Sequence, residues 1–199
     1  MPKSGMARGL VIACLVAILG LCGLVSWKLY QRSVGAEAGS VAIGGPFSLT
    51  DQDGKHVTEA DLKGKLSLIY FGYTFCPDAC PTALGTITAA LNKMGADADQ
   101  VTPVFITIDP ERDTQQVMKE YASNFHPRLR ALTGSVDEVT AAAHAYKIYF
   151  TKEGGTDPQN YLMNHSTLIY LMDRDGKYLA HFGPQATPDD IATEVRKYL

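Results

Sequence analysis

Two cysteines, Cys76 and Cys80, are the residues whose type and spacing best support chemistry in this chain. They lie in the stretch Phe75–Pro81, which reads FCPDACP and directly follows an apolar run typical of a buried strand. Thiols placed where a strand ends and a helix begins lie near the positive end of the helix dipole, which favours the thiolate. The thiolate attacks disulfides and binds metals, so the pattern indicates either redox cycling or a metal site.

The prolines of this stretch predict where the helix begins. Pro81 would remove a backbone hydrogen bond and clash with an earlier carbonyl if it lay deep inside a helix, so we expect the helix to begin there. Cys80 is then the N-cap and Cys76 lies in the preceding loop, with a spacing close to one helical turn. Asp78 either tunes the thiols or contacts a partner, or it is an acid favoured at a helix start. The simplest alternative is a pair of inert thiols in the core.

A metal site needs at least one further ligand, and His165 is the best candidate. It lies just before an apolar strand and is far from the cysteines in the sequence. Two thiolates and an imidazole suit copper, because thiolates favour Cu(I) and the nitrogen helps to hold Cu(II). Zinc prefers a fourth ligand or a water, but these residues do not exclude it. On a strand, Met163 would share the face of His165, where its sulfur could contact a soft metal, but the simpler interpretation is a core residue.

The remaining histidines have no companions at ligand spacing. They are interpreted as surface or packing residues. They are His56, His126, His144 and His181.

A redox function remains open. Thioredoxin-type dithiol enzymes place two residues between their cysteines and this chain places three, which weakens but does not forbid redox cycling. A thiol-disulfide oxidoreductase that reduces partner cysteines needs only Cys76 and Cys80. A peroxide-reducing activity is a weaker alternative, because the strand-loop-cysteine arrangement also resembles peroxiredoxins.

Hydrophobic patterning predicts a strand at Leu66–Phe71, a helix at Pro81–Met94 and a strand at Val101–Ile108. A short return between two such strands implies a right-handed parallel crossover. The elements expected after it are a helix at Thr114–Phe125, a helix opened by Ser135 and Glu138, a hairpin of Thr167–Met172 and Tyr178–Phe182, and a helix from Thr187.

This order of elements is typical of an α/β thioredoxin-like fold. An extra N-terminal β-hairpin is expected around Asp53-Gly54, a pair that favours tight turns. An insertion is expected at 147–161. Asp109-Pro110 predicts a turn after the second strand, and Asp113 or Thr114 predicts a helix cap, which explains these residues without catalysis.

The first 45 of the 199 residues differ in character from the rest. Gly9–Val25 carries no charge and, with the next two residues, is long enough to span a bilayer core of about 30 Å. We therefore predict one transmembrane helix within a membrane anchor at 1–32, a flexible linker at 33–45 and one domain at 46–199. A cleavable signal peptide ending near Ala38 is disfavoured, because the apolar run is too long and charged residues intervene.

The net charge and the two N-terminal cysteines indicate which partners and which location fit this chain. The net charge of −3, with no cluster of basic residues, argues against nucleic acid as a partner. Cys14 and Cys22 are interpreted as apolar residues of the anchor helix rather than lipid attachment sites. The short N-terminal tail favours a domain outside the cytoplasm.

Three motifs together resemble the Sco (SenC) family. They are FCPDACP, then TIDPERDT at Thr107–Thr114, then His165-Ser166. Members are membrane-anchored, thioredoxin-like copper proteins that help assemble the copper A centre of cytochrome c oxidase. The resemblance covers nearly the whole predicted domain and implies copper held by Cys76, Cys80 and His165.

The resemblance also implies partners and a location. The recipient would be the apo copper A site of cytochrome c oxidase subunit II, and the donor another copper chaperone or a thioredoxin-like reductase. The location would be the bacterial periplasm or the mitochondrial intermembrane space. One departure is Asn164, where the family usually has an aspartate, and we expect it to weaken the electrostatic support of the metal or the histidine.

Overall fold

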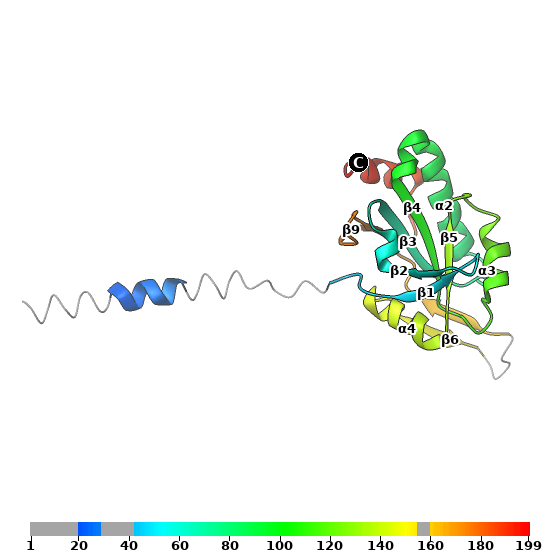
Figure 1. The fold of residues 1–199 in the computed structure, drawn as a ribbon, viewed down its shortest axis with the longest axis horizontal. Helices are drawn as coiled ribbons and strands as arrows, with labels where there is room; N and C mark the ends of the chain where they lie inside the picture. Colours follow the sequence, from blue (N-terminus) through cyan, green and yellow to red (C-terminus); the bar gives the residue numbers. More distant parts are fainter. Residues whose placement is uncertain (1–19, 29–41, 155–159) are drawn as a thin grey trace, which may run out of the picture. The chain divides into compact units, whose positions relative to one another are not determined.

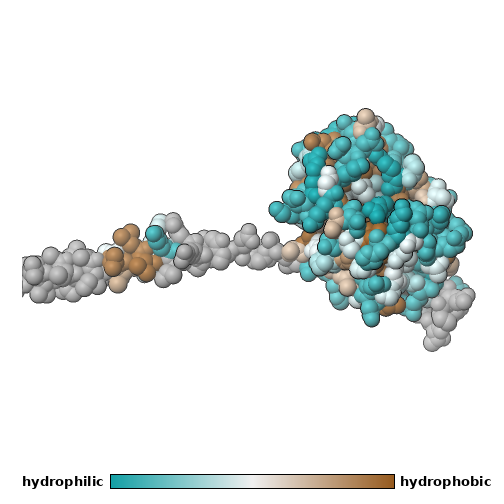
Figure 2. Space-filling view, in the orientation of Figure 1, coloured by the Kyte–Doolittle hydropathy of each residue, from teal (hydrophilic) through white to brown (hydrophobic). Residues whose placement is uncertain are grey.

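The computed structural model describes residues 20–28, 42–154 and 160–199 (Figure 1). It divides the chain into two compact units, Met1–Val41 and Ala42–Leu199. Residues 20–28 of the first unit are helical and expose apolar side chains, including Leu21 and Trp27. Figure 2 shows the hydrophobic surface of this segment in brown. Within the described ranges, no helix is both long and apolar enough to cross a membrane. Most of the predicted anchor and linker lies outside these ranges.

The second unit is built on a seven-stranded sheet with the order β2-β1-β5-β4-β3-β8-β9 (Figure 1). Its strands are β1 (Ser48–Asp51), β2 (His56–Thr58), β3 (Leu66–Gly72), β4 (Val101–Thr107), β5 (Arg130–Thr133), β8 (Ile169–Met172) and β9 (Tyr178–Phe182). The neighbours β3, β4 and β5 are parallel, and the other pairs are antiparallel. A separate two-stranded sheet joins β6 (Phe150–Glu153) to β7 (Leu162–His165).

Helices connect and cover these strands. They are η1 (Glu59–Leu62), α2 (Ala79–Met94), η2 (Gly95–Gln100), α3 (Gln115–Ala122), α4 (Val136–Ala145) and α5 (Pro188–Arg196). Helix α2 packs against α5, α3 against β5, and α4 against β1. Strands β3 and β8 are buried along their whole length, as expected for central strands covered on both faces. The predicted α/β arrangement is confirmed.

The predicted N-terminal hairpin is present at one edge of the main sheet. Strands β1 and β2 turn at Gly54, whose positive φ of 81° suits glycine, and pair Leu49 with Val57. Strand β1 also pairs with β5, which the sequence did not predict. The hairpin therefore extends the main sheet.

Two of the predicted helix starts are confirmed in detail. Helix α4 opens with a capping box, in which the hydroxyl of Ser135 accepts from the Glu138 backbone N–H and the Glu138 carboxylate accepts from the Ser135 N–H. Helix α3 is capped by Thr114, whose hydroxyl accepts from the Val117 N–H at 3.4 Å. Asp113, the other candidate for that cap, is buried and has a different role.

Candidate metal centre

The cysteine pair lies where strand β3 gives way to helix α2. Helix α2 begins at Ala79, with Asp78 as its N-cap, so Cys80 is the second residue of the helix and Pro81 the third. The prediction that Cys80 is the N-cap was wrong. The first N–H groups of a helix have no intrahelical partner, so a proline is tolerated throughout the first turn and does not have to begin it. Cys76 lies in the preceding loop, as predicted.

Helix periodicity explains why Cys80 is buried. Its side chain precedes Leu84 by one turn on the buried face of α2, which continues through Ile87 and Leu91, and it has no exposed surface. The end of β3 passes directly against this sulfur, because a Cβ added to Gly72 would lie 2.6 Å from Cys80 Sγ. A glycine at the end of an apolar strand pattern can mark such a close approach, but no role for Gly72 was predicted from the sequence.

The two thiols differ in environment. Cys76 is half-buried, and its sulfur accepts a hydrogen bond from the Cys80 backbone N–H at 3.4 Å. Burial raises the pKa of the Cys80 thiol well above its usual value, and the neighbouring Cys76 adds to this effect. The hydroxyl of Tyr70 points at Cys80 Sγ from 3.9 Å. Cys76 is therefore the accessible thiol and Cys80 the internal one.

His165 ends strand β7 and turns its imidazole toward the thiols. Its Nε2 lies 3.6 Å from Cys80 Sγ, while its Nδ1 lies 2.9 Å from the carbonyl oxygen of Ser166. A proton on Nδ1 donated to that carbonyl leaves the Nε2 lone pair facing the sulfurs. Burial lowers the pKa of His165 and favours this neutral form. The rings of Tyr70 and Tyr73 approach the imidazole edge-on.

The three predicted ligands therefore converge from two segments, the loop and start of α2 that carry the cysteines and the strand β7 that carries the histidine. The ligand atoms of Cys76, Cys80 and His165 all lie within 4.8 Å of one another. Two sulfurs and one unprotonated nitrogen form a soft donor set, which fits copper better than a hard cation.

The residues beside His165 alternate along β7. Met163 is buried and lies on the His165 side of the strand, where its backbone N–H donates to the hydroxyl of Tyr73 at 3.2 Å. Asn164 is exposed on the opposite side and donates to the carboxylate of Glu153 at 3.1 Å. The side chain of Asn164 therefore has no direct contact with the imidazole.

The other histidines lie apart from this group. The ring of His56 bonds to the hydroxyl of Ser48, and that of His181 to the hydroxyl of Tyr178. His126 accepts from the backbone N–H of Arg128, and burial lowers its pKa. His144 is exposed at the end of α4. These positions agree with their interpretation as surface or packing residues.

The segment between β4 and α3 contacts the loop that carries Cys76. The fully buried carboxylate of Asp113 accepts from the backbone N–H of Thr74 at 3.0 Å, from its hydroxyl at 2.5 Å and from the hydroxyl of Thr107 at 2.6 Å. Asp113 therefore fastens the residues before Cys76 to the end of β4. The sequence predicted a cap here and missed this contact, because the two segments are 39 residues apart.

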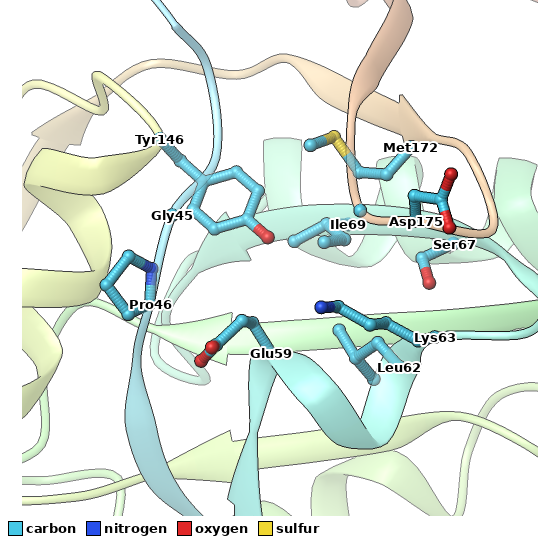
Figure 3. A pocket seen from close by; sticks show the side chains of 11 residues that line it. Gly45, Pro46, Glu59, Leu62, Lys63, Ser67, Ile69, Tyr146, Met172 and Asp175 are labelled. Atoms are coloured by element: carbon cyan, nitrogen blue, oxygen red, sulfur yellow. The ribbon is translucent and has the colours of Figure 1, made fainter.

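A cavity of about 210 Å³ lies elsewhere in the second unit. Figure 3 shows the side chains of Glu59, Lys63 and Tyr146 among the residues that line it. It is lined by Ser67 and Ile69 of β3 and includes none of the three candidate ligands. Two of these ligands, Cys76 and Cys80, follow the carboxyl end of β3, and His165 ends β7. The cavity is therefore distinct from the candidate metal centre.

The fold and the site define the class of protein: a thioredoxin-like domain with two cysteines at the start of its first crossover helix and a histidine brought to them. Residues 35–199 match the SCO1/SenC family, and the chain belongs to that family. It is 39% identical over 187 residues to the SCO2-like protein of Rickettsia felis, covering 92% of this chain and 91% of the relative.

Solved structures agree with this assignment. ScoI of Bradyrhizobium japonicum with copper bound is 50% identical, with a TM-score of 0.74 over 79% of this chain and all of that one. BsSco, described as a member of the Sco family of cytochrome c oxidase assembly proteins and as having a disulfide switch, is 28% identical. Its TM-score is 0.62, with 79% of this chain and 93% of that one covered. The thioredoxin-like prediction is confirmed.

Proposed function

We propose that this chain is a copper metallochaperone of cytochrome c oxidase assembly that holds copper through Cys76, Cys80 and His165. The observation that carries the proposal is the convergence of three soft donor atoms within 4.8 Å. The family and the copper-bound relative support the choice of metal.

The geometry suggests how copper would be received and passed on. Cys80 and His165 form the internal side of the site, whereas Cys76 is partly exposed and can exchange ligands with an incoming thiol. A partner thiolate that attacks copper displaces Cys76 first, and the internal ligands follow. We propose the apo copper A site of cytochrome c oxidase subunit II as recipient, and another copper chaperone as donor.

We propose in addition that the chain is anchored by its N-terminal apolar segment, with the domain outside the cytoplasm, in the bacterial periplasm or the mitochondrial intermembrane space. The apolar run and the exposed apolar side chains of residues 20–28 support anchoring. Partition of the full chain into a membrane fraction, lost on deletion of residues 1–32, tests this proposal.

Metal titration of residues 42–199 tests the copper site directly. We expect equimolar Cu(I) or Cu(II) to bind, and Cu(II) to give a thiolate-to-metal charge-transfer band and an EPR signal with nitrogen coupling. A preference for zinc over copper, or no tight binding of either copper ion, would overturn the proposal.

Replacement of His165 by alanine is expected to affect the two oxidation states unequally. Cu(I) remains bound by the two thiolates, whereas Cu(II) loses its nitrogen donor. We expect the affinity for Cu(II) to fall by at least about 100-fold, which is more than the loss of a residue that only contacts a ligand costs. The measurements are competition titrations with each ion and the nitrogen coupling in the EPR spectrum. His144→Ala, at an exposed histidine, is the control and should behave as wild type.

Asn164→Asp is expected to change Cu(II) affinity less than about threefold, well below the usual cost of altering a contact to a ligand. The side chain points away from the imidazole and would place a second carboxylate near Glu153. A small loss of stability, about 0.5 kcal/mol, should result from this like-charge pair at the surface. A large gain in Cu(II) affinity would show that the aspartate acts on the metal through space.

A second function is favoured by the position of Cys76. Its half-buried sulfur accepts a hydrogen bond at a helix N-terminus, which is the setting of an attacking thiolate. As a thiol-disulfide oxidoreductase, Cys76 would attack a partner disulfide, and Cys80 would then release the reduced partner and close a Cys76–Cys80 disulfide. A thioredoxin-like reductase would have to restore the thiols. Full reductase turnover by His165→Ala would favour this function over copper delivery.

A further inference from the structure

The hairpin that carries His165 is attached to the domain largely through side chains. Strands β6 and β7 form their own two-stranded sheet, separate from the seven-stranded one. Met163 bonds to the Tyr73 hydroxyl, and Lys152 forms an ion pair with Glu111. The position of His165 relative to the thiols therefore depends on such contacts.

Arg112 makes the most extensive of these contacts. Its guanidinium carbon lies 3.6 Å from the ring centroid of Tyr161, and its Nη1 donates to the Tyr161 carbonyl at 2.9 Å. Its Nε donates to the carboxylate of Asp109 at 2.5 Å, and that buried carboxylate also accepts from the Tyr161 hydroxyl at 2.5 Å. Arg112 and Asp109 thus hold both the ring and the backbone of Tyr161.

Arg112 also contacts the loop that carries Cys76. The guanidinium carbon of Arg112 lies 4.8 Å from the ring centroid of Phe75, the residue directly before Cys76. Phe75 is 52% exposed, so it lies against the cation rather than in the core. Tyr161 precedes His165 by four residues, and one side chain therefore contacts both ligand-bearing segments.

We infer that Arg112 is a positioning residue that fixes the distance between His165 and the two thiols. This inference rests on the proposed copper site. The guanidinium keeps its place although its buried Nη2 has no hydrogen-bond partner among the residues that the structure describes, which costs free energy. The two ring contacts and the ion pair with Asp109 offset that cost. A planar guanidinium can stack on rings and bond to a carbonyl and a carboxylate at once, which a lysine ammonium does not reproduce.

Arg112→Lys in the full chain tests the inference, because it keeps the charge beside Asp109 and loses the planar stack. We expect Cu(II) affinity to fall by about 10- to 100-fold and the nitrogen coupling in the EPR spectrum to weaken. Cu(I) stoichiometry should not change, because both thiols remain. Arg196→Lys, at an exposed ion pair with Asp97, is the matched control.

A second variant and a measurement without copper distinguish a failure of the Arg112 inference from a failure of the proposed copper site. Tyr161→Leu removes the ring and hydroxyl that Arg112 and Asp109 hold, and should reproduce the Arg112→Lys phenotype. In copper-free protein, the imidazole NMR signals of His165 should shift or broaden in both variants and not in the control. Wild-type Cu(II) affinity and unchanged imidazole signals in both variants would overturn the inference, whereas failure of the wild type to bind copper would overturn the proposed function alone.

Discussion

Replacement of Cys80 by serine is expected to lower copper affinity by more than about 100-fold for both oxidation states, beyond the range of a lost supporting contact. Cys80 is the most buried of the three candidate ligands, and its sulfur is the one placed against His165. A serine hydroxyl is a hard, neutral donor that does not replace a thiolate toward Cu(I). Loss of the charge-transfer band and of tight Cu(I) binding in competition titrations would establish the effect.

The fold should tolerate this change, so the loss can be assigned to the site. A serine hydroxyl at this buried position has Tyr70 and His165 beside it as hydrogen-bond partners, and we expect a cost of about 1 kcal/mol. Cys22→Ser removes an exposed thiol from the helix at residues 20–28 and should leave copper binding unchanged. Tight Cu(I) binding by Cys80→Ser would contradict the ligand assignment.

The second large effect is expected on stability. Asp113→Ala should lower the free energy of unfolding by about 3–4 kcal/mol, because one backbone N–H and two hydroxyls lose their acceptor together. These donors belong to Thr74 and Thr107, so the loop before Cys76 is released from the end of β4. Urea unfolding of residues 42–199 measures the loss.

Asp113→Asn is the matched control for this prediction. Burial raises the pKa of Asp113, which means that the charged form is already disfavoured there. A neutral amide keeps one acceptor oxygen in the same place, and we expect it to cost about 1 kcal/mol. Equal losses in the two variants would show that the hydrogen bonds of the carboxylate are not the source of its contribution.

Local patterns in the sequence predicted much of the fold and the candidate ligands. The apolar stripe at Leu84, Ile87 and Leu91 gave the buried face of α2, and the capping residues of α3 and α4 gave their starts. The strands that escaped prediction, β5, β6 and β7, have four residues each, too few for a periodic pattern to be distinctive. The equally short β1 and β8 were predicted because an Asp-Gly turn pair follows each of them.

The contacts that organise the site could not be predicted, because they join distant segments. Arg112 and Tyr161 are 49 residues apart, and Asp113 and Thr74 are 39 apart. The same limit applies to Asn164, since only the pairing of β6 with β7 decides that its side chain faces Glu153. The prediction of a turn and a helix cap at Asp109–Asp113 was therefore incomplete, because it did not include the contacts of these residues with Thr74 and Tyr161.

The close approach of Gly72 to Cys80 has a consequence for oxidative damage. The sulfur already fills the space that a Cβ at residue 72 would need, so that side of it has no room for an added oxygen atom. Peroxide meets Cys76 first, because Cys76 is the accessible thiol. A sulfenic acid formed there condenses with Cys80 to a disulfide, which a reductant can reverse. The missing side chain at residue 72 thus directs oxidation of the pair toward a reversible product.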